Sequence, residues 1–293
     1  MVKIACIPAY NEEKLIGDVI QRCKLHVDKV IVCDDGSTDH TSDIAIKAGA
    51  VVLQHKKNKG KGNAMKTLFE YAKKNGVDVM ITIDGDGQFL PEEIPKILEP
   101  IIKENADIVI GYRFDDNEEM PSYRKMGNKM LDKFTNLASD LPFRDTQGGF
   151  RSYSKKAINA INITTDGFSV DSEILIDASK KGLKIVEEKV TVIYNTGGST
   201  STKSSVSHST EVVVSLLEII AINHPLRYLG LPGIVLITIG VIFAIFVLIT
   251  FNEIRYFSIP YTLISMATIL IGIIFLLMSV VLFSIGATAK RNN

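Results

Sequence analysis

Two carboxylates separated by a single glycine form the stretch of this chain with the clearest chemical potential. Asp84 and Asp86 follow the apolar run 79–83 and stand in the sequence Asp-Gly-Asp-Gly-Gln. The run predicts a buried strand, and the glycines let the backbone turn tightly enough to aim both acids at one point. Carboxylate oxygens suit Mg²⁺ or Mn²⁺, which commonly bridge to substrate phosphates. An acidic surface turn is the competing interpretation of such a pair taken alone.

Two further polar segments follow apolar runs earlier in the chain. Residues 8–13 read Pro-Ala-Tyr-Asn-Glu-Glu after one run, and residues 34–39 read Asp-Asp-Gly-Ser-Thr-Asp after the next. Strand patterns alternate with helical patterns as far as residue 111, which predicts an α/β fold with a mostly parallel sheet and helices on both faces. Ligands bind at the carboxyl ends of the strands in such sheets. We therefore expect the three segments to meet at one edge.

A basic loop with glycines, residues 55–63, precedes a helix expected at 64–74. Lysine side chains and free backbone N–H groups favour anions, so Lys61 is a candidate phosphate contact. A solvated run of charges is an equally good interpretation. The loop lacks the GxxxxGK[ST] spacing of a Walker A sequence, which excludes that kind of phosphate site.

Composition divides the chain into an ordinary soluble part and an apolar C-terminal part. The 293 residues include 33 basic and 33 acidic side chains, and this balance predicts no nucleic-acid partner. We expect a cytosolic domain at 1–203 and an amphipathic interfacial helix at 204–225, for which packing on the soluble domain is the alternative. Transmembrane helices are expected at 229–251 and 257–289, because each exceeds the roughly 20 apolar residues that span a bilayer.

Positive charge flanks both outer ends of the predicted hairpin. Arg227 precedes the first span, and Lys290 and Arg291 follow the second. Cytoplasmic flanks carry the excess of lysine and arginine, so we expect a protein of the cell membrane with both termini in the cytoplasm. The three cysteines stand in apolar patterns without metal-ligand spacing, which predicts reduced, buried thiols.

The three strand-end segments, in this order over roughly residues 1–150, resemble the family 2 glycosyltransferases of the GT-A fold. The sequence Asp-Thr-Gln-Gly-Gly-Phe-Arg at 145–151 and the C-terminal hairpin narrow the resemblance to the polyprenyl-phosphate sugar synthases, the dolichyl-phosphate mannose and glucose synthase group. The resemblance implies a Rossmann-like GT-A domain. It also implies an enzyme that transfers a sugar from a nucleotide sugar to dolichyl or polyprenyl phosphate, with inversion at the anomeric carbon.

The resemblance further implies roles for individual residues on the donor side. The nucleotide base and ribose would be held by Pro8, Tyr10, Glu12 and Asp35. The metal ion and the diphosphate would be held by Asp84, Asp86 and Gln88, with Lys61 beside the phosphates. A bound Mg²⁺ or Mn²⁺ would neutralise the leaving nucleoside diphosphate.

On the acceptor side, the resemblance is joined by an argument from charge. A lipid phosphate is largely dianionic at pH 7, since its second pKa is roughly 6, so it needs cations more than a general base. Arg113 and Arg124 match family arginines that hold this phosphate, and arginine forks suit its geometry. The family loop near the donor sugar corresponds to Asp145, Gln147 and Arg151, with Glu173 as a weaker candidate.

Two departures from the family pattern leave the donor open. Asn128 stands where the family often has serine, and residues 194–200 lack the arginine that mannose synthases carry after the last strand. The loop at 145–151 looks more like that of archaeal members that use UDP-sugars. We therefore expect UDP-GlcNAc or another UDP-sugar, in the supply of lipid-linked sugar for protein N-glycosylation, with GDP-mannose as the alternative.

Two other functional classes compete with this expectation. Processive polysaccharide synthases usually add a Gln-x-x-Arg-Trp segment and more spans, whereas this chain has no tryptophan. A non-catalytic membrane protein that binds nucleotide sugar or scaffolds glycosylation enzymes is the remaining alternative. The intact acidic pair and both phosphate-type arginines argue against it. The sequence leaves the oligomeric state open.

Overall fold

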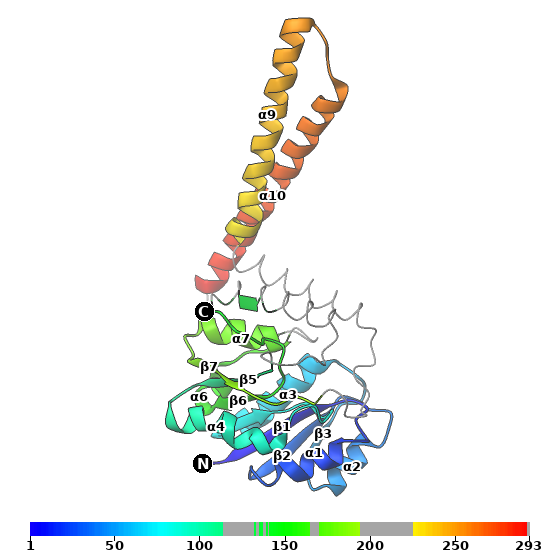
Figure 1. Cartoon of the computed structure of the whole chain (residues 1–293), viewed down its shortest axis with the longest axis vertical. Helices are drawn as coiled ribbons and strands as arrows, with labels where there is room; N and C mark the ends of the chain where they lie inside the picture. The colour runs from blue at the N-terminus through cyan, green and yellow to red at the C-terminus, as the bar shows by residue number, and fades with distance from the viewer. Residues whose placement is uncertain are drawn as a thin grey trace. The chain divides into compact units, whose positions relative to one another are not determined.

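The computed structural model describes residues 1–113, 132, 135–136, 139, 141–164, 170–193 and 225–291. The chain divides into two units, Met1–Leu216 and Leu217–Asn293, whose elements are labelled in Figure 1. The helix predicted at 204–225 lies outside the described residues, except for Pro225.

A seven-stranded sheet forms the centre of the first unit, with strand order β3-β2-β1-β4-β6-β5-β7. The strands are β1 Lys3–Ala9, β2 Lys29–Asp34, β3 Val51–Gln54, β4 Val79–Thr82, β5 Ile108–Tyr112, β6 Arg151–Ser154 and β7 Ile185–Lys189. Neighbouring strands are parallel except where β6 lies antiparallel between β4 and β5. The prediction of a mostly parallel α/β sheet is therefore confirmed, and the reversed strand is an addition to it.

Helices cover both faces of this sheet, as predicted (Figure 1). One face packs against α1 Ile16–Cys23, α2 Thr41–Lys47 and α4 Ile94–Lys103, the last preceded by a 3₁₀ turn at Pro91–Glu93. The other face packs against α3 Lys61–Lys74, α6 Lys155–Ala160 and α7 Val170–Lys180. The helix α3 begins at Lys61 rather than at Ala64, which places Lys61 in its first turn.

The strand β1 explains why the sheet is apolar on both sides. Successive side chains of a strand point to opposite faces, and Ala5 and Ile7 enter one core whereas Ile4 and Cys6 enter the other. All four are essentially inaccessible to solvent. A strand covered on both faces needs a continuous apolar run rather than an alternating one, and this is the pattern that the sequence carries. The predicted burial of the cysteines is also observed.

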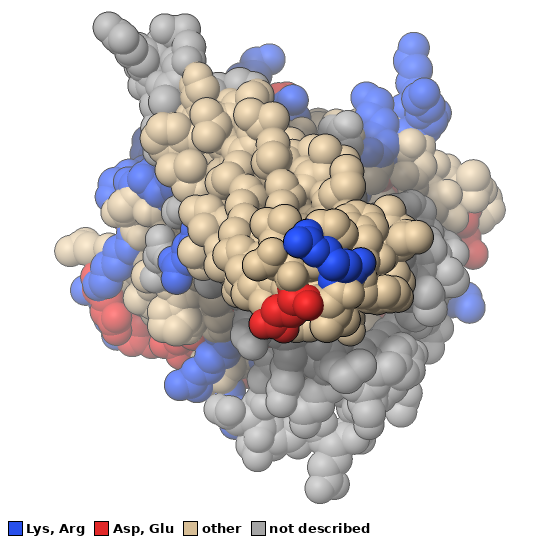
Figure 2. All heavy atoms as spheres, turned by 90° about the horizontal axis from the view of Figure 1, so that it is seen from above, with Lys and Arg blue, Asp and Glu red and all other residues tan. Residues whose placement is uncertain are grey.

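The second unit is a pair of long apolar helices. A π-helical turn at Leu226–Gly230 leads into α9 Leu231–Ile254, and α10 spans Ile259–Arg291. The stretches Leu226–Ile254 and Ile259–Ser284 have mean hydropathies of 3.1 and 2.8. Both are long and apolar enough to cross a membrane. In Figure 2 the near face of this unit is uncharged except for a few acidic and basic side chains near its centre.

Small residues bring α9 and α10 together. A Cβ atom at Gly233 would lie 2.9 Å from the carbonyl oxygen of Gly272, and one at Gly272 would lie 2.7 Å from that of Gly233. The Ser265 hydroxyl donates to the Gly240 carbonyl oxygen at 2.8 Å. Lipid is as apolar as a partner helix, so the hydrophobic effect does not drive helices together within a membrane. Apolar helices associate there through close backbone contact at small residues such as glycine and serine.

A glycine after β2 lets the basic loop lie directly on the strand end. Gly36 has φ +74°, and a Cβ atom there would come within 2.5 Å of the Lys57 carbonyl carbon and 2.7 Å of the Asn58 nitrogen. Both neighbours are backbone atoms, so neither can swing aside. The turn therefore requires glycine for its conformation and for space.

We predict that Gly36→Ala destabilises the protein more than the matched change Gly76→Ala. Gly76 also has positive φ, +62°, but no described heavy atom lies within 4 Å of a Cβ built there. Gly76→Ala should cost about 1 kcal/mol from backbone strain alone, and Gly36→Ala roughly 1–3 kcal/mol more from the overlap. Urea unfolding of the detergent-purified chain, followed by circular dichroism, measures both. Equal losses would contradict the packing described here.

Candidate active site

The three polar segments predicted to meet do lie at one edge of the sheet. They follow β1, β2 and β4, which are adjacent and parallel. The first two are joined by hydrogen bonds: the Asn11 side-chain oxygen accepts from the Thr38 nitrogen at 2.8 Å, and the Asn11 nitrogen donates to the Ser37 hydroxyl at 2.9 Å. The segment that carries the predicted nucleotide contacts Pro8, Tyr10 and Glu12 is thereby fixed against the segment after β2.

Acidic groups from two of these segments share a partly buried space. Burial and the charges of Asp86 and Asp84 raise the pKa of Glu12 to about 8. Burial and the charge of Asp84 likewise raise the pKa of Asp86 to about 6. Carboxylates that disfavour one another's ionisation mark a place where a cation is stabilised. The predicted acidic pair is therefore brought together, with Glu12 beside it.

Lys61 supplies positive charge at this place. Its ammonium lies 3.2 Å from an oxygen of Asp84 and 3.0 Å from an oxygen of Asp171. Burial lowers the pKa of Lys61, but the two carboxylates more than offset this effect and hold the pKa above its ordinary value. The residue predicted to meet phosphate thus contacts one acid of the pair, Asp84, directly.

Sequence reasoning missed Asp171 and considered Glu173 instead. Glu173 accepts from the nitrogen and the hydroxyl of Thr164, at 2.8 and 2.5 Å, and so holds the start of α7 locally. Asp171 stands in the first turn of the same helix and is buried. No local feature of the sequence distinguishes Asp171 from Glu173, because both are acids at the start of the same helical pattern.

The loop at 145–151 lies directly on Asp84. A Cβ atom at Gly149 would fall 2.3 Å from an Asp84 carboxylate oxygen, so a side chain there would displace the carboxylate. The Thr82 hydroxyl, at the end of β4, donates to the Gly149 carbonyl oxygen at 2.9 Å. Asp145, which is fully buried, forms an ion pair with the Nε of Arg113 at 2.8 Å. The loop therefore joins a predicted donor-side residue to a predicted acceptor-side one.

Arg151 fixes this loop through hydrogen bonds to its backbone. Its side chain is fully buried, and its guanidinium donates to the carbonyl oxygens of Gly148 at 2.9 Å, Thr146 at 2.8 Å and Asp171 at 2.8 Å. The Gln147 amide adds a bond of 2.7 Å to the Ser172 hydroxyl. Arg151 was predicted near the donor sugar, and its observed contacts connect the loop to α7.

We predict that Arg151→Met lowers the free energy of unfolding by about 3 kcal/mol or more, because three buried carbonyl oxygens lose their donors. Arg144→Met, immediately before this loop and exposed, should change it by no more than about 1 kcal/mol. Thermal unfolding of the purified chain compares the two variants. Similar losses in both would show that the buried contacts contribute little.

Asp35, predicted to accept from the nucleotide base, organises the basic loop. It is buried, and one oxygen lies 2.6 Å from His55 Nδ1 and 3.0 Å from the Lys59 nitrogen, while the other accepts from the Gly60 nitrogen at 2.7 Å. A carboxylate has about four acceptor positions, so these donors occupy most of them. Asp35 thereby fixes the backbone immediately before Lys61.

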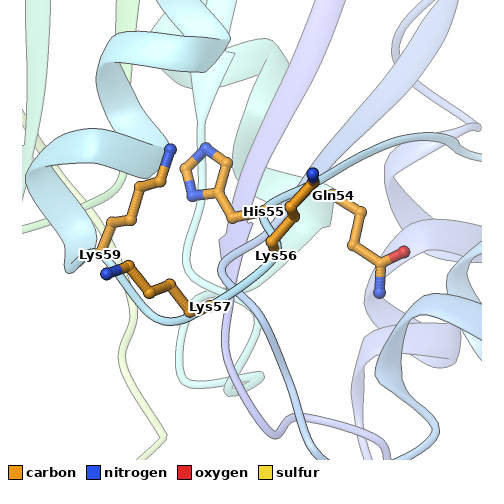
Figure 3. A pocket seen from close by; sticks show the side chains of 5 residues that line it. All are labelled: Gln54, His55, Lys56, Lys57 and Lys59. Carbon is orange, nitrogen blue, oxygen red and sulfur yellow. The ribbon is translucent and has the colours of Figure 1, made fainter.

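The same loop borders a pocket of about 460 Å³ lined by Gln54, His55, Lys56, Lys57 and Lys59. In Figure 3 the side chains of His55, Lys57 and Lys59 extend to one side of the loop, and Gln54 points to the other. Ammonium groups make this pocket attractive to anions. It lies beside the carboxyl ends of β2 and β3, next to Asp35.

The predicted metal site has oxygen donors but few protein ligands. In the described part of the chain, no three or more His, Cys, Asp or Glu side chains are grouped to hold a metal ion. Asp84 and Asp86 supply two carboxylates, and the Gln88 nitrogen donates to an oxygen of Asp86 at 3.0 Å. Hard oxygen donors with few protein ligands fit Mg²⁺, which usually shares its coordination with substrate phosphates. Arg124 lies outside the described residues.

The fold is that of known sugar-nucleotide enzymes. Glucosyl-3-phosphoglycerate synthase from Mycobacterium tuberculosis, solved with Mn²⁺ and UDP-glucose, superposes with a TM-score of 0.59 at 22% identity, over 74% of this chain and 78% of that one. This likeness confirms the predicted GT-A type of fold. The glycosyl transferase family 2 model matches residues 4–161, and the chain therefore belongs to that family.

Relatives with assigned activities agree with this membership. A UDP-N-acetylglucosamine–dolichyl-phosphate N-acetylglucosaminyltransferase from Methanococcus voltae is 32% identical, over 71% of this chain and 89% of its own length. Glycosyltransferase AglJ from Haloferax volcanii is 29% identical over 93% of this chain and 90% of its own. A dolichol-phosphate mannosyltransferase from Pyrococcus furiosus is 31% identical over 62% and 53%. The protein is a glycosyltransferase, and the predicted resemblance to the polyprenyl-phosphate sugar synthases is confirmed.

Proposed function

We propose that this glycosyltransferase transfers a sugar from UDP-GlcNAc, or another UDP-sugar, to dolichyl or polyprenyl phosphate. The observation that carries the proposal is the 32% identity to the Methanococcus voltae enzyme, whose name states this donor and this acceptor, over 71% of the chain. The strand-end acids and the apolar helices support it, because the reaction uses a nucleotide sugar and a lipid phosphate as its two substrates.

The donor would lie at the carboxyl ends of β1, β2 and β4. Pro8, Tyr10, Glu12 and Asp35 would contact the base and ribose. Asp84, Asp86 and Gln88 would hold Mg²⁺ or Mn²⁺, and a structural relative was crystallised with Mn²⁺ and UDP-glucose. When bound, the ion would neutralise charge on the departing nucleoside diphosphate.

The acceptor needs binding and orientation rather than activation. An oxygen of the dianionic lipid phosphate forms the new bond to the anomeric carbon as the bond to the diphosphate breaks, and no proton has to be removed from the nucleophile. Arg113 and Arg124 would hold this phosphate through charge-assisted hydrogen bonds. The loop with Asp145, Gln147 and Arg151 would flank the donor sugar; Asp145 is already paired with Arg113.

The two apolar helices would anchor the enzyme in the cell membrane, where its acceptor is found. Arg227 precedes the first helix, and Lys290 and Arg291 end the second, so we infer a cytoplasmic catalytic unit and cytoplasmic termini. The product would be a lipid-linked sugar for protein N-glycosylation. GDP-mannose is the second candidate donor, supported by the 31% identity to the Pyrococcus furiosus mannosyltransferase.

A donor screen tests this function. The purified full chain is incubated with dolichyl phosphate, Mn²⁺ or Mg²⁺, and labelled UDP-GlcNAc, UDP-glucose or GDP-mannose. We expect labelled lipid phosphate from UDP-GlcNAc and a loss of about 100-fold or more in Asp86→Asn. Asp18→Asn, an exposed change on α1, is the control and should keep its rate. Donor binding by calorimetry without turnover on any acceptor would favour the scaffold alternative.

The acceptor assignment makes a separate prediction for Arg124→Ala. The variant should raise the KM for lipid phosphate about tenfold, which corresponds to one lost charged hydrogen bond. The KM for the nucleotide sugar should stay within about twofold, because the donor would be bound elsewhere. Initial rates with each substrate varied in turn give both constants. An equal rise in the two would remove the acceptor role.

A further inference from the structure

One ammonium group ties together three segments that are distant in the sequence. Lys61 is the first residue of α3, Asp84 follows β4, and Asp171 lies in the first turn of α7. The ammonium lies 3.2 Å from Asp84 and 3.0 Å from Asp171. It is therefore shared between a predicted metal ligand and a carboxylate to which no part of the proposed reaction gives a role.

Both carboxylates are held in place by contacts with other parts of the chain. The side chain of Asp171 is 6% exposed, and its backbone oxygen accepts from the buried Arg151 guanidinium. Asp84 rests against Gly149, where a Cβ atom would overlap it. Lys61 follows Gly60, whose nitrogen is fixed by Asp35. The arrangement is consequently built by several elements and does not depend on a flexible surface pair.

An ammonium in this position competes with a divalent ion. Asp84 and Asp86 bring two carboxylates to the site, and Lys61 balances part of their charge through its contact with Asp84. A divalent ion bound by Asp84 would face a positive charge at contact distance from the same carboxylate, and like charges repel strongly in a partly buried space. The ion would bind more easily if the ammonium moved toward Asp171.

We propose that Lys61 is a built-in counter-ion of Asp84, which a divalent ion must displace, and that Asp171 is the positioning residue that receives the displaced ammonium. The inference rests on the proposed metal site. It assigns the Lys61–Asp171 pair the task of setting metal affinity, so that the site binds the ion weakly until a diphosphate adds its own negative charge.

The test measures Mn²⁺ binding to the full chain in detergent without nucleotide, from the electron paramagnetic resonance signal of free Mn²⁺. Lys61→Met should bind Mn²⁺ about tenfold more tightly than the unaltered chain, because a repelling charge is gone. Asp171→Asn should bind it more weakly, because the ammonium then rests on Asp84 alone. Lys66→Met on α3 and Asp177→Asn on α7 are the matched controls and should leave the affinity unchanged.

The double variant Lys61→Met/Asp171→Asn separates positioning from direct ligation. If Asp171 acts through Lys61, the double variant binds Mn²⁺ at least as tightly as the unaltered chain; weaker binding would make Asp171 a metal ligand and overturn the proposal. Unchanged or weaker binding in Lys61→Met would also overturn it. If Asp86→Asn retained full Mn²⁺ affinity, or if neither the unaltered chain nor Lys61→Met bound the ion, the proposed metal site would fail together with this inference.

Discussion

The contact between Asp84 and the loop at 145–151 is the constraint on which the candidate site depends. Gly149 leaves no room for a side chain beside the carboxylate, and the buried Arg151 guanidinium fixes the loop through three carbonyl oxygens. A buried guanidinium is tolerated only when its donors are satisfied, so these bonds must form together. The antiparallel strand β6 begins at Arg151, and its pairing with β4 places this guanidinium at the carboxyl end of β4.

Charge in the site is balanced by contacts between elements. Asp35 is satisfied by His55 and two backbone nitrogens, Asp145 by Arg113, and Asp84 by Lys61. Burial and neighbouring acids raise the pKa of Glu12 and of Asp86. These two acids lie where the glycosyltransferase fold is proposed to bind a cation.

The strands and their polar ends were predictable from sequence, because an apolar run followed by glycines and acids is a local signal. The same holds for the two long apolar helices, whose composition alone identifies them. The roles of Lys61, Asp171 and Arg151 were not predictable in this way. Lys61 and Asp171 are 110 positions apart in the sequence, and nothing in either local pattern indicates the other. The reversal of β6 was missed because its short polar sequence carries no sign of strand direction.

The ion pairs in the site also bear on how the proposed substrates would bind. Lys61 and Arg113, the two described cations assigned to phosphates, each contact a buried carboxylate. A phosphate that takes such a cation exchanges one ion pair for another, so the gain in free energy is the difference between the two pairs and not the full strength of either. A site built in this way selects its ligands by their geometry and number of charges, and it binds them with moderate affinity. Moderate binding favours turnover, because a nucleoside diphosphate product held at full electrostatic strength would leave slowly.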